Sequence, residues 1–219
     1  MLKNIKSYIS IHLNIPLLYK HGYYSQEGED IILQKIFLNK KRGFYVDVGA
    51  HHPFRYSNTY LLYKKGWKGI NIDVTPGTKK MFDMARSKDV NLEVGIDKTQ
   101  GIRTLFLFED HALNTFSPNY YKNIVESNQS KLLKKIRVRT YPLRFILKKY
   151  AEEKNIDFLN IDVEGFELNV LESNNWKLYK PQVIVVENLS KNTKVENFLK
   201  NFNYSLKAQT LSSQIYVKS

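Results

Sequence analysis

Five short apolar segments, separated by longer polar ones, set the strongest limit on how this chain can fold. Each is too short for a helix, is rich in β-branched or aromatic residues, and carries an acidic residue at or near its carboxyl end. This is typical of buried parallel strands whose carboxyl ends line a ligand crevice. The segments are residues 43–49, 69–74, 90–96, 156–163 and 181–187.

Four stretches between or after these segments, residues 57–65, 77–87, 166–174 and 192–201, have the apolar spacing of amphipathic helices. The alternation predicts an α/β fold with a doubly wound, mostly parallel sheet in the strand order 3-2-1-4-5. This order brings the ends of the first and fourth strands together.

Three further segments depart from the alternation. Residues 204–209 and 214–218 predict an antiparallel hairpin at the far edge of the sheet, and residues 101–108 predict another antiparallel hairpin. The polar stretch 110–130 is long enough to be a functional lid. With 219 residues in all, we expect a single domain over residues 23–219, preceded by an N-terminal extension, residues 1–22.

Composition excludes several classes of protein. The chain has no cysteine, which excludes disulfides, Cys-ligated zinc, iron–sulfur clusters and thiol catalysis. No segment approaches the roughly 20 apolar residues of a membrane helix, and the polar residues among the first 22 do not fit a signal peptide, so we expect a cytoplasmic protein. The single sequence leaves the oligomeric state open, a homo-oligomer included.

The end of the first predicted strand favours a particular kind of ligand. A nicotinamide site needs three glycines in the pattern G-x-G-x-x-G, whereas only Gly49 is present here. One glycine after Asp47 suits a ligand without pyrophosphate, such as S-adenosylmethionine, whose ammonium or ribose meets the acid. Alternatively, Gly49 only closes the turn and Asp47 caps it.

Two more acids follow the next strands. Asp73 is placed to accept both hydroxyls of an adenosine ribose, and Asp97 to contact the adenine. The alternatives are a helix cap at Asp73 and a plain turn at Asp97. Together with Asp47, these residues predict a nucleoside lying across the edge of the sheet.

Four segments carry a resemblance to a known family: YSQEGEDIIL (24–33), YVDVGAHHPFRYSNTYLLYKKGWKGINID (45–73), ALNTF (112–116) and IDFLNIDVEGFELNVL (156–171). In this order and spacing, the chain from about residue 24 to 188 resembles the FkbM-type family of S-adenosylmethionine-dependent methyltransferases. The resemblance implies the Rossmann-like class I methyltransferase fold and methyl transfer, commonly to a hydroxyl of a sugar or natural product. It also implies that Ser57 and Thr59 begin the helix that holds the methionine carboxylate, with helix capping as the alternative.

The fourth and fifth strands end in acids that suit catalysis. Catechol-type O-methyltransferases have a carboxylate and an acid–amide pair at these ends, and Asp162, Glu187 and Asn188 resemble that metal-binding set. Oxygen ligands of this kind suit Mg or Mn. However, this chain has Glu where that family has Asp, and the extra methylene could move the carboxylate out of reach. Without a metal, Asp162 or Glu164 would act as the base.

Three histidines compete for the role of base. His51 and His52 follow the predicted cofactor turn, and His111 opens the polar stretch. An imidazole of ordinary pKa can accept a hydroxyl proton near neutral pH. The alternative is that these side chains only complete hydrogen bonds in loops.

The charge of the chain is unevenly distributed. The net charge is +13, and residues 131–149 hold eight Lys and Arg but no acid. This stretch could be a solvated face, a docking site for a phosphorylated or nucleotide-linked substrate, or a nucleic-acid site. No zinc-finger or RRM motif supports the last, so an RNA-binding module with a degenerate cofactor site is the second choice. We expect a nucleotide-linked or phosphorylated sugar substrate used in cell-surface polysaccharide biosynthesis.

Overall fold

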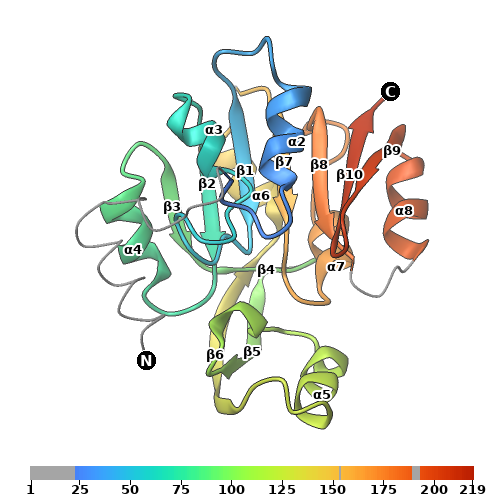
Figure 1. Cartoon of the computed structure of the whole chain (residues 1–219). Coiled ribbons are helices and arrows are strands. Elements are labelled where there is room, and N and C mark those ends of the chain that lie inside the picture. Colours follow the sequence, from blue (N-terminus) through green and yellow to red (C-terminus); the bar gives the residue numbers. More distant parts are fainter. Residues whose placement is uncertain (1–22, 153, 189–192) are drawn as a thin grey trace.

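The computed structural model describes residues 23–152, 154–188 and 193–219. The predicted N-terminal extension, residues 1–22, therefore lies outside the described residues. A seven-stranded sheet in the order β3-β2-β1-β7-β8-β10-β9 forms the centre of the molecule (Figure 1). Its strands are β1 (Phe44–Val48), β2 (Lys68–Asp73), β3 (Val90–Glu93), β7 (Phe158–Ile161), β8 (Val183–Glu187), β9 (Tyr204–Gln209) and β10 (Ser213–Lys218).

The predicted strand order is confirmed. β3, β2, β1, β7 and β8 pair in parallel, and β10 runs antiparallel to both β8 and β9, so that the C-terminal hairpin closes the far edge. The predicted third strand is divided, because residues after Glu93 leave the main sheet and join a second one.

Helices cover both faces of the main sheet. On one face, α2 (Glu29–Ile36) and α3 (Tyr60–Lys64) pack on Tyr45 of β1 through Leu33 and Leu62. On the other face lie α6 (Leu143–Tyr150), α7 (Glu167–Glu172) and α8 (Thr193–Lys200). The remaining helices are α4 (Thr78–Ala85), α5 (Pro118–Glu126) and the 3₁₀ helix η2 (His111–Leu113).

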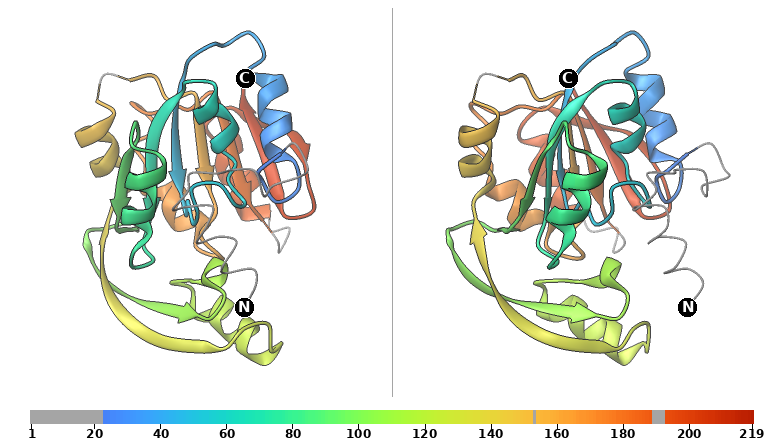
Figure 2. Two further views of the ribbon diagram at one scale, coloured as in Figure 1. Left: turned by 60° about the vertical axis from the view of Figure 1, so that its left-hand side comes forward. Right: turned by 90° about the vertical axis from the view of Figure 1, so that its left-hand side faces the viewer.

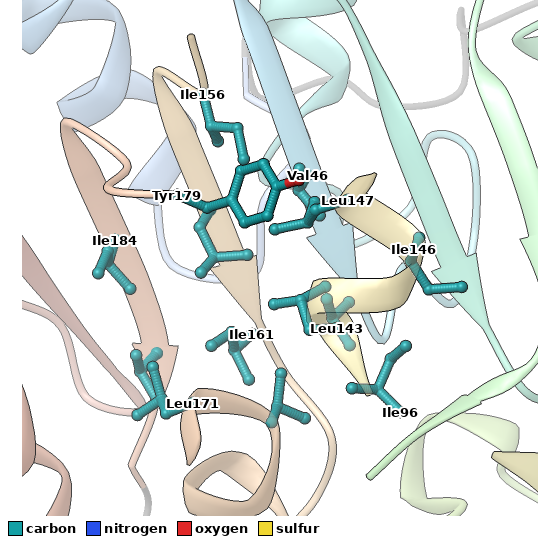
Figure 3. Packing of buried hydrophobic residues seen from close by; sticks show 14 of the residues in the cluster. Val46, Ile96, Leu143, Ile146, Leu147, Ile156, Ile161, Leu171, Tyr179 and Ile184 are labelled. Atoms are coloured by element: carbon teal, nitrogen blue, oxygen red, sulfur yellow. The ribbon is translucent and has the colours of Figure 1, made fainter. Parts of the chain in front are cut away.

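Side chains alternate between the faces of β1, so one strand supplies both cores. Figure 3 shows Val46 of β1 and Ile161 of β7 packed against Leu143 and Leu147 of α6. Burial of such side chains contributes about 1.5–3 kcal/mol each. The central strands are therefore the best-buried part of the fold, and their carboxyl ends are held on a rigid support.

A second, three-stranded sheet has the order β4-β6-β5. It consists of β4 (Gly95–Ile96), β5 (Gly101–Phe108) and β6 (Leu132–Tyr141). Residues 101–108 thus pair antiparallel with β6 rather than forming a hairpin on their own. β5 and β6 make a long curved ribbon that passes beneath the carboxyl ends of the main strands, with α5 at its tip (Figure 2). Among the described residues, no helix is long and apolar enough to cross a membrane.

Candidate active site

A cleft opens at the carboxyl ends of β1, β2 and β7, and it is also lined by Leu105 of β5 and His111 of η2. Gly49, Asp73 and Asp162, three residues predicted to converge, all line it. Gly49 has a φ of 83°, and a Cβ built there would lie 1.6 Å from the backbone oxygen of Asp162. Only glycine allows the ends of β1 and β7 to come this close.

Asp47 lines the cleft, but its carboxylate is buried and already hydrogen-bonded. It accepts a hydrogen bond from Thr59 Oγ1 at 2.7 Å and another from Asn160 Nδ2 at 2.9 Å. Burial raises the pKa of Asp47, while the nearby Arg86 guanidinium opposes that effect. Asp47 therefore fixes neighbouring polar groups at the bottom of the cleft.

Asp73, at the end of β2, has a more open position. Its two oxygens accept backbone hydrogen bonds from His51 N at 2.8 Å and Thr75 N at 2.7 Å. Each carboxylate oxygen has a further acceptor position, so the side chain is oriented and still able to bind hydroxyl groups.

Ser57 and Thr59 do not line the cleft; Tyr56 and Asn58 do. The Ser57 hydroxyl accepts a hydrogen bond from Tyr60 N at 3.1 Å, and Thr59 donates to Asp47. The Ser57 side chain thus caps the start of α3, as in the capping alternative, whereas Thr59 makes no side-chain cap hydrogen bond and holds the end of β1. That the start of α3 holds the methionine carboxylate stays a prediction.

Asp97 also lies away from the cleft. Its carboxylate is bound by Arg103 Nε, by Asn169 Nδ2 at 3.1 Å and by Lys98 N at 2.8 Å. The chain leaves the main sheet after Glu93, so Asp97 follows a strand of the second sheet, and its contact with adenine stays a prediction. Apolar side chains line this end of the cleft instead: Val74, Val94, Ile96, Leu105, Phe116 and Phe166.

The three histidines differ in what they can do. His51 lines the cleft, with Arg55 Nη2 lying 2.9 Å from its Nε2, and burial lowers its pKa to about 4. His52 Nδ1 accepts hydrogen bonds from Phe54 N and Arg55 N, burial lowers its pKa to about 3, and it does not line the cleft. His52 therefore holds the turn that follows it, and its role as a base stays a prediction. His111, on η2, is exposed and lines the cleft.

The most unusual group at the cleft is a set of three carboxylates. Oxygens of Asp162, Glu164 and Glu187 all lie within 4.8 Å of one another. Burial, with further contributions from neighbouring carboxylates, raises the pKa of Asp162 to about 7, that of Glu164 to about 9 and that of Glu187 to about 12. Glu164 Oε2 is buried, and no described residue hydrogen-bonds to it. Three carboxylates this close together repel one another when ionised, so they are stable only if some are protonated or a cation binds them.

Asn188, predicted as a metal ligand, has its side-chain amide hydrogen-bonded to β10. Its Nδ2 donates to Gln214 Oε1 at 2.8 Å, across the β8–β10 pair. Glu164, which the sequence suggested only as a base, completes the carboxylate set together with Asp162 and Glu187. Glu164 reaches this position because it has a left-handed backbone, with a φ of 54°.

The basic stretch does not reach the cleft. Arg137 pairs with Thr104 and Arg139 with Ile102, and these exposed residues share one face of the ribbon. Leu105, which lines the cleft, is on the opposite face. Among the described residues that line the cleft, none is Lys or Arg. The cleft of this basic protein is thus acidic.

The family of the chain is shown by comparison with known proteins. A family model described as the methyltransferase FkbM domain matches residues 47–206. The chain belongs to this family. It is therefore an S-adenosylmethionine-dependent methyltransferase, as the resemblance implied, and its main sheet has the predicted doubly wound strand order. No curated protein is similar enough to this chain to count as a match.

Among solved structures, the chain is similar to an O-methyltransferase from Bacillus cereus in complex with SAH. The two are 15% identical, the alignment covers 98% of this chain and 97% of that one, and the TM-score is 0.39.

Proposed function

We propose that this FkbM-family protein methylates a hydroxyl of a sugar, and that the carboxylates of Asp162, Glu164 and Glu187 activate that hydroxyl. The carboxylate set carries the proposal, because Asp162 and Glu164 line the cleft and Glu187, at the end of β8, has an oxygen within 4.8 Å of theirs. The sulfonium methyl of the cofactor is already reactive, so the protein must mainly align an oxygen with it and remove a proton. Alignment alone can contribute several kcal/mol, about 7–11 at most.

The cleft suits the cofactor in shape and charge. Gly49 lines the cleft at the end of β1, where its lack of a side chain lets β1 and β7 meet, and Asp73 is oriented to accept the ribose hydroxyls. The apolar side chains around Ile96 and Phe116 can hold the adenine. The sulfonium and ammonium groups of the cofactor are positive. They favour a cleft whose described lining holds acids and neither Lys nor Arg.

A divalent metal fits the same carboxylates. The set offers only oxygen ligands. It includes Glu164 Oε2, which is buried and accepts no hydrogen bond from a described residue. A cation would also relieve the repulsion among the three carboxylates. We propose Asp162, Glu164 and Glu187 as ligands of Mg or Mn, with Asn188 beside them. Such a metal would supply stabilisation of the substrate alkoxide when bound.

The proton of the hydroxyl needs an acceptor. With a pKa of about 7, Asp162 is suited to general-base catalysis near neutral pH when no metal is bound. His111 is the better placed histidine, because it is exposed at the cleft, whereas Nε2 of His51 faces Arg55.

The substrate class follows from the same charges. An uncharged sugar ring with free hydroxyls suits the acidic cleft, and the family resemblance favours sugars used in cell-surface polysaccharide. If the sugar is phosphorylated or nucleotide-linked, its phosphates would lie outside the described lining of the cleft, since that lining holds no Lys or Arg.

A screen of free, phosphorylated and nucleotide-linked sugars, with mass detection of a methyl gain, tests the substrate class. Asp162→Asn should abolish transfer to a substrate found in this way while cofactor affinity stays within about two-fold. Chelation should also abolish transfer, and Mg or Mn should restore it. Transfer only to protein, lipid or RNA would reject the sugar, and full activity after exhaustive chelation would reject the metal.

A further inference from the structure

The segment between β5 and β6 contacts the turn that carries Glu164. Thr115 Oγ1 donates a hydrogen bond to the backbone oxygen of Glu164 at 2.7 Å, and both residues are buried. The ring of Phe116 packs edge-on against Phe166 with centroids 5.6 Å apart. The segment therefore contacts the turn at residues 164–165 at Glu164 and again just after it at Phe166.

The turn itself has a conformation that needs such support. Glu164 and Gly165 are both left-handed, with φ values of 54° and 85°. A left-handed glutamate is uncommon and persists only where its surroundings impose it. The hydrogen bond from Thr115 holds the backbone of Glu164, but it does not orient the carboxylate.

Tyr120, on the first turn of α5, contacts both residues of this turn. A Cβ built on Gly165 would lie 3.3 Å from the Cβ of Tyr120, so the tyrosine packs directly on the glycine. The Tyr120 hydroxyl interacts with the Glu164 side chain. Tyr120 itself does not line the cleft. The Glu164 side chain thus meets a polar group from a residue that is outside the described lining of the cleft.

We propose that Tyr120, together with Thr115, is a positioning residue that holds the Glu164 carboxylate beside Asp162 and Glu187. The inference rests on the proposed function, in which these carboxylates activate the substrate. Thr115 holds the strained backbone directly, and Tyr120 orients the Glu164 side chain, which also stabilises the turn at residues 164–165 against opening. Groups behind a metal ligand or catalytic acid typically change metal affinity or activity by about 10- to 100-fold when removed.

The neighbouring tyrosine offers a matched control. Tyr121 lies on the same helix, and its ring stacks on Phe106 with centroids 4.3 Å apart. Tyr120→Phe and Tyr121→Phe each remove one hydroxyl from adjacent positions of α5, but only the first removes a partner of Glu164. For the hydrogen bond from Thr115 to the backbone oxygen of Glu164, Thr115→Val removes the hydroxyl and Thr115→Ser keeps it.

The experiment measures Mn²⁺ affinity of the full chain with S-adenosylhomocysteine present, together with amide hydrogen exchange of residues 163–167. Tyr120→Phe and Thr115→Val should weaken Mn²⁺ binding by about 10- to 100-fold and speed this exchange, whereas Tyr121→Phe and Thr115→Ser should match the parent protein. Equal Mn²⁺ affinity and equal exchange in Tyr120→Phe and Tyr121→Phe would overturn the inference.

A parent protein that does not bind Mn²⁺ would reject the metal in the proposed function and leave the inference to the exchange measurement. In that case, faster exchange confined to Tyr120→Phe and Thr115→Val supports the positioning role. Unchanged exchange in both variants overturns it.

Discussion

Glu187→Gln should stabilise the metal-free protein. The Glu187 carboxylate lies within 4.8 Å of the oxygens of Asp162 and Glu164. At this separation and an effective dielectric constant of about 20, two ionised carboxylates would repel by about 3.5 kcal/mol, so Glu187 takes up a proton when the chain folds. Glutamine is neutral without that proton and keeps the shape of the side chain, so the cost of protonation is removed without leaving a cavity.

The pKa of Glu187 leads to a similar value. Burial and the neighbouring carboxylates raise it from the ordinary 4.5 to about 12, so the folded protein keeps this group protonated at pH 7. At 1.36 kcal/mol per pH unit, holding that proton at pH 7 costs about 3 kcal/mol of folding free energy. Because the folded state binds the extra proton, stability from this group is greatest below pH 4.5 and falls as the pH rises.

Urea unfolding in EDTA checks this reasoning. We expect Glu187→Gln to raise the free energy of unfolding by about 2–3 kcal/mol at pH 7 and by less than about 1 kcal/mol at pH 5, where the unfolded glutamate is only partly ionised. With saturating Mn²⁺ the order should reverse, since the parent protein gains a ligand interaction that the variant lacks. A destabilised variant in EDTA, or an equal gain at both pH values, would refute the explanation.

Two further predictions concern the cofactor side of the cleft. Gly49→Ala should lower the thermal midpoint by well over 5 °C and abolish cofactor binding, because its Cβ would collide with the Asp162 backbone oxygen; a normal melting curve would contradict the close approach of β1 and β7. Asp73→Ala should weaken S-adenosylmethionine binding by about 1.5–3 kcal/mol in calorimetry, whereas Asp97→Ala should lower stability and leave that affinity nearly unchanged. Equal losses of affinity in these two variants would show that Asp97 reaches the ligand after all.

The order of the strands and the acids at their ends could be read from the sequence, because parallel strands are buried on both faces and their ends must meet at one edge. What the sequence left open was the direction of each side chain. Asp47 and Asp73 both end strands, yet the first is enclosed by Thr59 and Asn160 while the second stays open. Asp97 turns away from the cleft through its bond with Arg103.

The ribbon of β5 and β6, with the residues between them, was the hardest part to predict. β5 and β6 pair with each other outside the main sheet. The many charged residues of β6 did not give the pattern of a strand, because its outer face is exposed to solvent. Thr115 belonged to a segment that resembles the family, but its partner, the backbone of Glu164, lies 49 residues away in the chain. Such a contact depends on the closed fold and leaves no local pattern.

Among the described residues that line the cleft, none is Lys or Arg, and this has a consequence for turnover. S-adenosylmethionine carries a positive sulfonium, and this charge disappears when the methyl group leaves. The carboxylates around the cleft therefore attract the reactant more strongly than the spent cofactor, whose sulfur is neutral. Methyl transfer thus lowers the affinity of the protein for the demethylated cofactor. An acidic cleft inside a molecule of net charge +13 favours exchange of the used cofactor for a fresh one.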